Sequence, residues 1–320
     1  MSGDVAGRET ADRPTRRPAE GRFRRWAGRF DLRAMPYVLV SPYFLLFAVF
    51  GLFPLGFTLW VSMHKWRLAG EKEFIGLDNY GFLLTNSGFW NATYNTVGMF
   101  VMVTIPQLAM ALLLANALNK RMRGRLLLRM GILLPMVTSV VAVAIVFSQL
   151  FSYRYGMINW GLESLGFDRV DWQAGRLPSW LAITTMVDWR WTGYNAIIFL
   201  AAMQTIPRDL YEAAAIDGAS PRRQFWQITI PQLRPVIIFV VFISTMGGLM
   251  LFAEPMMFGS GRYDGGAAGN FQTIGLYIVQ AFRERNNYGL AAAAAWLLFM
   301  LILIIALINY LFTNRIRGNK

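Results

Sequence analysis

Six stretches of mostly apolar residues, separated by shorter polar segments, set the pattern of this chain. A helix of about 20 apolar residues crosses the roughly 30 Å hydrocarbon core of a bilayer. Each stretch reaches or approaches that length, so the pattern predicts an all-α membrane protein with six transmembrane helices. The expected spans are residues 37–63, 94–118, 127–152, 180–205, 233–258 and 290–312.

Two of these spans contain polar interruptions. Asp188-Trp189-Arg190-Trp191 falls inside the fourth span, and the fifth contains Gly247-Gly248 and Glu254-Pro255. Breaks inside a membrane span usually face protein or a water-filled cavity. We therefore expect the fourth and fifth spans to border such a cavity.

The basic residues predict the orientation of the chain. The N-terminal tail, the connections 119–129 and 208–235, and the C-terminal tail together hold 21 Lys and Arg, whereas the three alternate connections hold nine. Cytoplasmic segments retain positive charge. Both termini and the 208–235 loop are therefore expected to be cytoplasmic.

The same pattern divides the chain into three parts. Residues 1–36 are Arg-rich and interrupted by proline, and we expect a disordered cytoplasmic tail that either only fixes topology or also grips anionic lipid. Residues 37–315 form the six-helix membrane domain, and 316–320 a short cytoplasmic tail. The first span is too long for a signal-peptide core and lacks a following cleavage site, so it should remain in the mature protein.

Composition narrows the possible functions. Of 320 residues 55% are hydrophobic, 15% are charged and none is cysteine, which excludes disulfides and thiolate metal sites. The net charge of +13 comes from short basic blocks between apolar runs, a pattern that indicates membrane topology and not a nucleic-acid partner.

The single histidine, His64, is expected to be an interfacial anchor. No lysine follows a glycine, so a phosphate-binding G-x-x-x-x-G-K-[ST] loop is absent. We expect a non-catalytic chain without metal or cofactor.

A polar loop, residues 207–231, separates the fourth and fifth spans. Asp209 with Glu212 three residues later has the spacing of a capping box, and Gly218 stands where a left-handed C-terminal cap is needed. These residues predict a short helix that ends in a tight turn.

A second short helix is expected after that turn. Ser220 is a candidate N-cap, with Pro221 at the first helical position, and Pro231 is expected to stop the helix. Physical reasoning alone leaves an ordinary helical hairpin and a docking element equally open.

Resemblance to a known family favours the docking element. The string Glu212-Ala213-Ala214-Ala215-Ile216-Asp217-Gly218, followed by Ile228 and Pro231, resembles the EAA loop of binding-protein-dependent ABC importer permeases. Ile230 departs slightly from the leucine that is more frequent before the final proline. The resemblance covers about 37–315, and Gly76-Leu77-Asp78-Asn79-Tyr80 is similar to the first permease subunit of sugar-type systems. It implies the type I importer fold in a bacterial inner membrane.

The resemblance also implies a mechanism and partners. The loop would be a coupling helix that inserts into a cytoplasmic ATPase, with Glu212 as the charged contact, Ala213 and Ala214 as the close fit, and Gly218 as the turn. The implied partners are a sister permease, two ATPase subunits that hydrolyse ATP, an extracellular or lipid-anchored sugar-binding protein, a sugar and membrane lipid. Residues 244–255 look like those of cellobiose, lactose and oligosaccharide permeases, which points to a di- or oligosaccharide.

Candidate pathway residues come from the polar interruptions. Ionisable groups inside spans tend to face a cavity or a partner, and sugars are bound by aromatic faces together with amides and carboxylates. Two competing interpretations stay open: Asp188 and Arg190 pair with each other near an interface, and Trp189 and Trp191 belong to the interfacial aromatic belt. The candidates for the substrate pathway are Glu254, Asn195, Tyr194, Trp191, Gly247 and Gly248.

Two other functional classes remain as alternatives at this point. An ion-coupled secondary transporter or channel would use Asp188, Arg190 or Glu254 as the coupling charge, although the chain shows no clear internal repeat of three and three spans. A membrane scaffold would use the 207–231 loop to recruit a soluble partner without transporting a solute.

Overall fold

The computed structural model describes residues 22–67, 70, 72–120 and 123–317. By contacts the chain divides into two units, residues 1–57 and 58–320, which are described separately. Most of the predicted N-terminal tail, residues 1–21, and the last three residues of the C-terminal tail lie outside the described residues.

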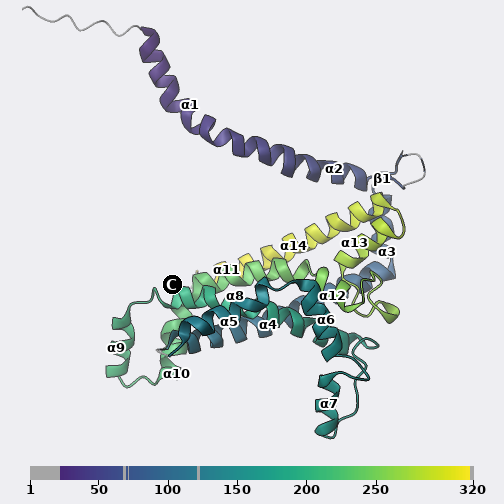
Figure 1. Cartoon of the computed structure of the whole chain (residues 1–320). Helices are drawn as coiled ribbons and strands as arrows, with labels where there is room; N and C mark the ends of the chain where they lie inside the picture. The colour runs from purple at the N-terminus through teal and green to yellow at the C-terminus, as the bar shows by residue number, and fades with distance from the viewer. Residues whose placement is uncertain (1–21, 68–69, 71, 121–122, 318–320) are drawn as a thin grey trace, which may run out of the picture. The chain divides into compact units, whose positions relative to one another are not determined.

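The first unit is helical from its first described residue (Figure 1). Helix α1 (Arg22–Phe47) is followed by a π-helical turn, η1 (Ala48–Leu52), and by the start of α2 (Phe53–Ser62). The structure therefore differs from the expected disorder over 22–36. The reason lies in the distribution of proline: residues 22–35 contain none, and most of them are good helix formers.

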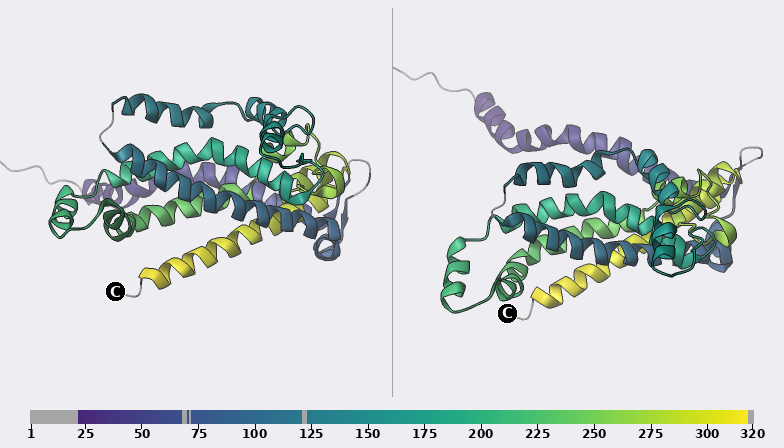
Figure 2. Two further views of the ribbon diagram at one scale, coloured as in Figure 1. Left: turned by 90° about the horizontal axis from the view of Figure 1, so that it is seen from below. Right: turned by 60° about the horizontal axis from the view of Figure 1, so that its bottom comes forward.

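The second unit is built around long helices that run side by side (Figures 1 and 2). Helix α4 (Ser87–Asn119) packs along α8 (Arg176–Met203), and α11 (Ile230–Leu249) contacts both of them. Helix α5 (Arg125–Val137) lies against α8, and α14 (Tyr288–Arg317) packs on α11. These five helices form the bundle of the unit.

Shorter elements gather at the two ends of this bundle (Figures 1 and 2). Helices α9 (Arg208–Ile216) and α10 (Pro221–Gln224) project beyond one end, which also contains the C-terminal end of α14. The opposite end contains α3 (Asp78–Thr85), α7 (Met157–Ser164), α12 (Ala253–Phe258) and α13 (Ile274–Arg283). The remaining described elements are β1 (His64–Lys65), β2 (Glu73–Phe74), α6 (Val140–Leu150), π-helical η2 (Phe225–Thr229) and 3₁₀-helical η3 (Ala267–Gly269). Strands β1 and β2 form a small antiparallel hairpin.

Among the described residues, four helices are long and apolar enough to cross a membrane, and a bent pair of helices raises the number to five. The four are Met35–Ser62, Ser87–Asn119, Pro221–Leu249 and Tyr288–Leu311, and the bent pair is α5 with α6, which meet at 92°. The expected fourth span is an unbroken helix, α8, but its polar centre makes it less apolar than the others. The structure thus supports a multi-span helical protein without fixing the number of spans at six.

The fifth span differs most from its expected bounds, 233–258. The helix begins at Pro221, passes through η2 and ends at Leu249, one residue after Gly247-Gly248. The prediction that Pro231 stops a helix is wrong. Pro231 directly follows η2 at the start of α11, and the helix continues through it although proline offers no N–H to the preceding turn.

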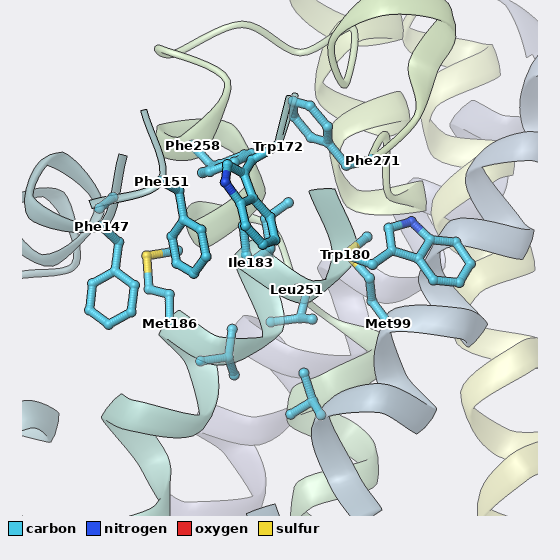
Figure 3. Close-up of a cluster of buried hydrophobic side chains, with 14 of the residues drawn as sticks. Met99, Phe147, Phe151, Trp172, Trp180, Ile183, Met186, Leu251, Phe258 and Phe271 are labelled. Atoms are coloured by element: carbon cyan, nitrogen blue, oxygen red, sulfur yellow. The ribbon is translucent and has the colours of Figure 1, made fainter. Parts of the chain in front are cut away.

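Buried hydrophobic side chains of the described residues form three clusters, one of which joins α3, α4, α13 and α14. The aromatic cluster, part of which is shown in Figure 3, joins α4, α6, α8 and α12, and the loop-proximal cluster joins α4, α8, η2 and α11. The aromatic cluster consists of Met99, Val103, Val143, Ala144, Phe147, Phe151, Trp172, Trp180, Ala182, Ile183, Met186, Val187, Leu251, Phe258 and Phe271. The loop-proximal cluster consists of Ala111, Ala115, Leu118, Ala196, Phe199, Leu200, Met203, Phe225, Leu233 and Val240.

Helix α5 approaches α8 at a glycine. A Cβ atom built on Gly193 would lie 1.7 Å from the carbonyl oxygen of Ile132, a backbone atom that cannot rotate away. We expect Gly193→Ala to push α5 from α8 and to cost about 1–3 kcal/mol, as overpacking does in other cores.

Thermal unfolding of the purified protein in detergent measures this effect. Gly131→Ala on α5 is the matched control, because nothing lies within 4 Å of its Cβ position. Equal melting temperatures for the two variants would contradict the close approach of α5 to α8.

Candidate functional site

Helix α9 is the first element of the loop that links α8 to α11. It begins at Arg208, with Pro207 as the preceding residue, and no side chain caps its first turn. The predicted capping box of Asp209 and Glu212 is therefore wrong, because the helix begins two residues earlier than an N-cap at Asp209 implies. Asp209 lies within the first turn, where its negative charge interacts favourably with the helix dipole.

The C-terminal end of α9 confirms the predicted turn at Gly218. Its φ is +78°, in the left-handed region that favours glycine. The N–H of Gly218 donates to the carbonyl of Ala215 at 3.1 Å, and the N–H of Ala219 donates to that of Ala214 at 2.8 Å. These two bonds form a Schellman motif, which ends the helix and reverses the chain.

The second predicted helix start is confirmed as well. The Ser220 hydroxyl accepts a hydrogen bond from the N–H of Arg223, and Pro221 occupies the first turn of α10. The hydroxyl groups of Tyr211 and Thr229, 2.9 Å apart, connect α9 to η2. The two arms of the loop are therefore joined near their base.

The loop is open on one face and anchored on the other. Glu212, Ala213 and Asp217 are exposed, and Ile216 is 87% exposed. Phe225, by contrast, is buried in the loop-proximal cluster with side chains from α4, α8 and α11. Of the remaining candidates, Ala214 and Ile228 are half-buried and Pro231 is exposed. The loop therefore presents Glu212, Ile216 and Asp217 on its open face, while Phe225 fixes its other side to the bundle.

A cavity of about 360 Å³ lies between the bundle helices. Along α4 and α8, the cavity lies between the aromatic cluster and the loop-proximal cluster. All six candidate pathway residues line it, so the structure brings together groups from two distant parts of the sequence. Its lining is Val103, Gln107, Val187, Trp191, Tyr194, Asn195, Ile243, Ser244, Gly247, Gly248, Met250, Leu251, Phe252, Ala253 and Glu254.

A hydrogen-bonded group of three side chains lies in the wall of the cavity. The amide of Asn195 on α8 donates to the Oε1 atom of Gln107 on α4 at 2.9 Å and to the hydroxyl of Ser244 on α11 at 3.4 Å. Gln107 and Ser244 were missed in the sequence analysis. Gln107 is a buried amide in the middle of the second expected span, away from Asn95 and Asn116 near its ends, and that position is the signal that could have identified it.

The charged residues of the cavity region pair across helices. Arg190 Nη1 donates to Glu254 Oε1 at 2.8 Å, which joins α8 to α12. The interpretation that Asp188 pairs with Arg190 is wrong, because residues two apart on a helix point in different directions. Asp188 is buried, and its Oδ1 atom has no hydrogen-bond partner among the described residues.

The two tryptophans that flank Arg190 lie on different faces of α8. Trp191 lines the cavity and meets Tyr194 edge to face, with ring centroids 6.1 Å apart. Trp189 is 47% exposed and lies against Phe147 of α6, outside the cavity. These positions favour Trp191, and not Trp189, as a residue of the substrate pathway.

The two glycines near the end of α11 also differ. Gly248 is buried, and a Cβ built on it would lie 3.0 Å from the Phe100 ring of α4. Gly247 is exposed and has open space around it. Gly248 thus permits the close approach of α4 to α11 beside the cavity.

Comparison with known proteins identifies the family of this chain. Residues 81–318 match the family model for the binding-protein-dependent transport system inner membrane component. The chain belongs to this family. The match includes the 207–231 loop and the cavity, and it confirms the resemblance found in the sequence.

Curated relatives span most of the chain. It is 36% identical over 278 residues to the lactose transport system permease protein LacF of Rhizobium radiobacter, covering 86% of this chain and 92% of the relative. It is 34% identical over 285 residues to the arabinooligosaccharides transport system permease protein AraP of Halalkalibacterium halodurans, covering 88% of each. The same identity relates it to the trehalose/maltose transport system permease protein MalF of Thermococcus litoralis, covering 88% and 94%.

A solved structure shares the fold. The crystal structure of a bacterial alginate ABC transporter, in complex with a periplasmic protein that holds an alginate pentasaccharide, contains a chain that matches with a TM-score of 0.75. The match covers 91% of this chain and 98% of the other at 22% identity. The likeness shows that the fold of the two chains is shared over nearly the whole length of this chain.

The turn at Gly218 generates a test of the loop. We expect Gly218→Val to destabilise the end of α9 by about 1–2 kcal/mol, because a β-branched residue resists positive φ. Hydrogen exchange of the α9 amides in the reconstituted protein should then accelerate. Gly218→Asn is the control, since asparagine tolerates this conformation and should keep the exchange slow. Unchanged protection in Gly218→Val would contradict the left-handed turn.

Proposed function

We propose that this chain is a transmembrane permease subunit of an ATP-driven, binding-protein-dependent importer of a sugar, namely a di- or oligosaccharide. The single observation that carries the proposal is the loop of α9, which is exposed on one face and anchored by Phe225 to the helices that line the cavity. The relatives named for lactose, arabinooligosaccharides and trehalose or maltose support the substrate class.

The loop transmits movement through the loop-proximal cluster. Phe225 packs with Phe199 of α8, Ala111 of α4 and Val240 of α11. Each of these helices continues from the cluster to the cavity. A displacement of α9 therefore reaches the cavity through close-packed side chains, and rocking of these helices opens it alternately to either side.

In this proposal α9 is the coupling helix. Glu212 supplies a charge to the ATPase groove, and the small side chains of Ala213 and Ala214 allow a close approach. Asp217, Gly218, Ile228 and Pro231 shape or support the loop. ATP is hydrolysed by two separate ATPase subunits, and this chain is non-catalytic.

The cavity has the chemistry of a sugar pathway. Trp191 and Tyr194 offer aromatic faces to the apolar side of a pyranose ring. Gln107, Asn195 and Glu254 offer amide and carboxylate groups to its hydroxyls. A sister permease completes the pathway, and an extracellular binding protein delivers the sugar.

The proposed topology places both termini in the cytoplasm of a bacterium. The excess of Lys and Arg supports this orientation. The C-terminal end of α14 also lies at the same end of the bundle as α9 and α10 (Figure 2). The opposite end, with α3, α7 and α13, then faces the binding protein.

Removal of the Glu212 charge tests the coupling. We expect Glu212→Ala to lower ATP-driven uptake of the sugar roughly tenfold, because loss of one central contact in an interface has that order of effect. Uptake is measured in proteoliposomes that contain this chain, its sister permease, the ATPase and the binding protein. Labelled cellobiose, lactose, maltose, trehalose and arabinooligosaccharides serve as substrates.

Glu212→Asp is the matched control, since it keeps a carboxylate at the same exposed position of α9. Its uptake should stay close to that of the unmodified complex. Full uptake by an assembled Glu212→Ala complex would remove Glu212 from the coupling surface. Uptake driven by an ion gradient without ATP would refute the proposed function itself.

A further inference from the structure

The Arg190–Glu254 ion pair stands apart from the other ion pairs among the described residues. Its side chains are only 12% and 9% exposed. The other pairs, Lys65–Glu73, Glu163–Arg169 and Arg262–Asp264, are considerably more exposed. Burial of a pair strengthens the dependence of each charge on its partner, because water no longer screens either one.

The two members of the pair have different positions relative to the cavity. Glu254 lines it, whereas Arg190 does not and reaches Glu254 from α8. Glu254 is the only ionisable carboxylate in the lining, and the other polar side chains there are neutral amides and hydroxyls together with an indole. Arg190 Nη1 bonds a single oxygen of Glu254, and the buried Nε of Arg190 has no hydrogen-bond partner among the described residues. Glu254 therefore lies between the cavity and Arg190, a cation whose hydrogen-bond donors are not all used.

We propose that the Arg190–Glu254 pair selects the charge of the transported sugar, with Glu254 masking Arg190 so that the cavity accepts uncharged sugars and rejects those bearing a carboxylate. This inference rests on the proposed function. A sugar carboxylate in the cavity meets the carboxylate of Glu254 at close range, and the resulting repulsion discriminates against it. An uncharged sugar instead presents hydroxyl donors that Glu254 can accept.

The neighbouring charge on α8 acts in the same direction. Asp188 is a buried carboxyl outside the cavity lining, and any charge that it carries is negative. It therefore adds to the repulsion of an acidic sugar and cannot replace Glu254 as the mask of Arg190 on the cavity side. The related fold of the alginate transporter serves the import of an acidic polysaccharide, so this fold does not itself impose charge selection. The side chains of the pathway must do so.

Four forms of the assembled complex test the inference, in the absence of the binding protein so that only the membrane subunits select. The forms are the unmodified complex, Glu254→Gln, Arg190→Gln and the double variant with both changes. The probes are the neutral sugar that the uptake experiment identifies and the same sugar oxidised at a primary alcohol to the uronic acid. Competition against the radiolabelled neutral sugar in a scintillation proximity assay gives the ratio of the two affinities.

We expect Glu254→Gln to raise the affinity ratio of acidic to neutral sugar roughly tenfold, since it uncovers Arg190. Arg190→Gln should lower the ratio, because it leaves an unbalanced carboxylate. The double variant should return the ratio to within about threefold of the unmodified complex, since it restores neutrality. Glu163→Gln, which breaks an exposed pair outside the cavity, is the matched control and should leave the ratio unchanged.

Any other order of the ratios overturns the inference. If Glu254→Gln leaves the affinity ratio unchanged, Arg190 does not reach the solute. If the double variant raises the ratio as much as Glu254→Gln does, the charge of Arg190 is not the cause of the rise. If Glu254→Gln does not assemble, the comparison of Arg190→Gln with the double variant decides the matter, because only removal of the Glu254 charge separates them. These outcomes are independent of the proposed function, which fails only if the unmodified complex takes up none of the neutral sugars in an ATP-dependent manner.

Discussion

Polar groups inside an apolar bundle must find partners on other helices, and this constraint organises the second unit of the chain. Helices α4 and α8 each carry several of these groups. Asn195 bonds Gln107 of α4, and Arg190 bonds Glu254 of α12. An unpartnered polar group in a membrane interior costs several kcal/mol, so these bonds fix how α8 rotates against its neighbours. Asn195, Gln107 and Glu254 also line the cavity, so the same bonds fix the positions of its polar groups.

The loop of α9 and α10 could be predicted well from the sequence because its structure is determined locally. Gly218 and Ser220 were assigned as caps correctly, since each acts on residues within three or four positions of itself. The beginning of α9 was placed two residues late. A Glu three positions after an Asp suggested a capping box, but Pro207 provides a preset φ that starts the helix without any side-chain cap.

The cavity could be predicted only in part. Trp191, Tyr194 and Asn195 were found because they interrupt an apolar pattern, yet the partner of Arg190 was assigned to the nearby Asp188 and is in fact 64 residues away. Pairing across helices depends on their rotation, which the sequence pattern does not encode. The end of the fifth span shows the same limit, because apolar residues continue past Leu249 although the helix does not.

The π-helical turn η2 gives the region between loop and cavity its mechanical character. By accommodating one additional residue per turn, it allows α10, η2 and α11 to continue as one helix of 29 residues from Pro221 to Leu249. Pro231 and Pro235 follow η2 within two turns, and neither can donate an N–H bond to the preceding turn. Helices bend where a π-helical turn or a proline interrupts their regular hydrogen bonds. The helix therefore bends most easily between η2 and Pro235, so a push on the loop is divided there: one part flexes the helix and the other part reaches the cavity.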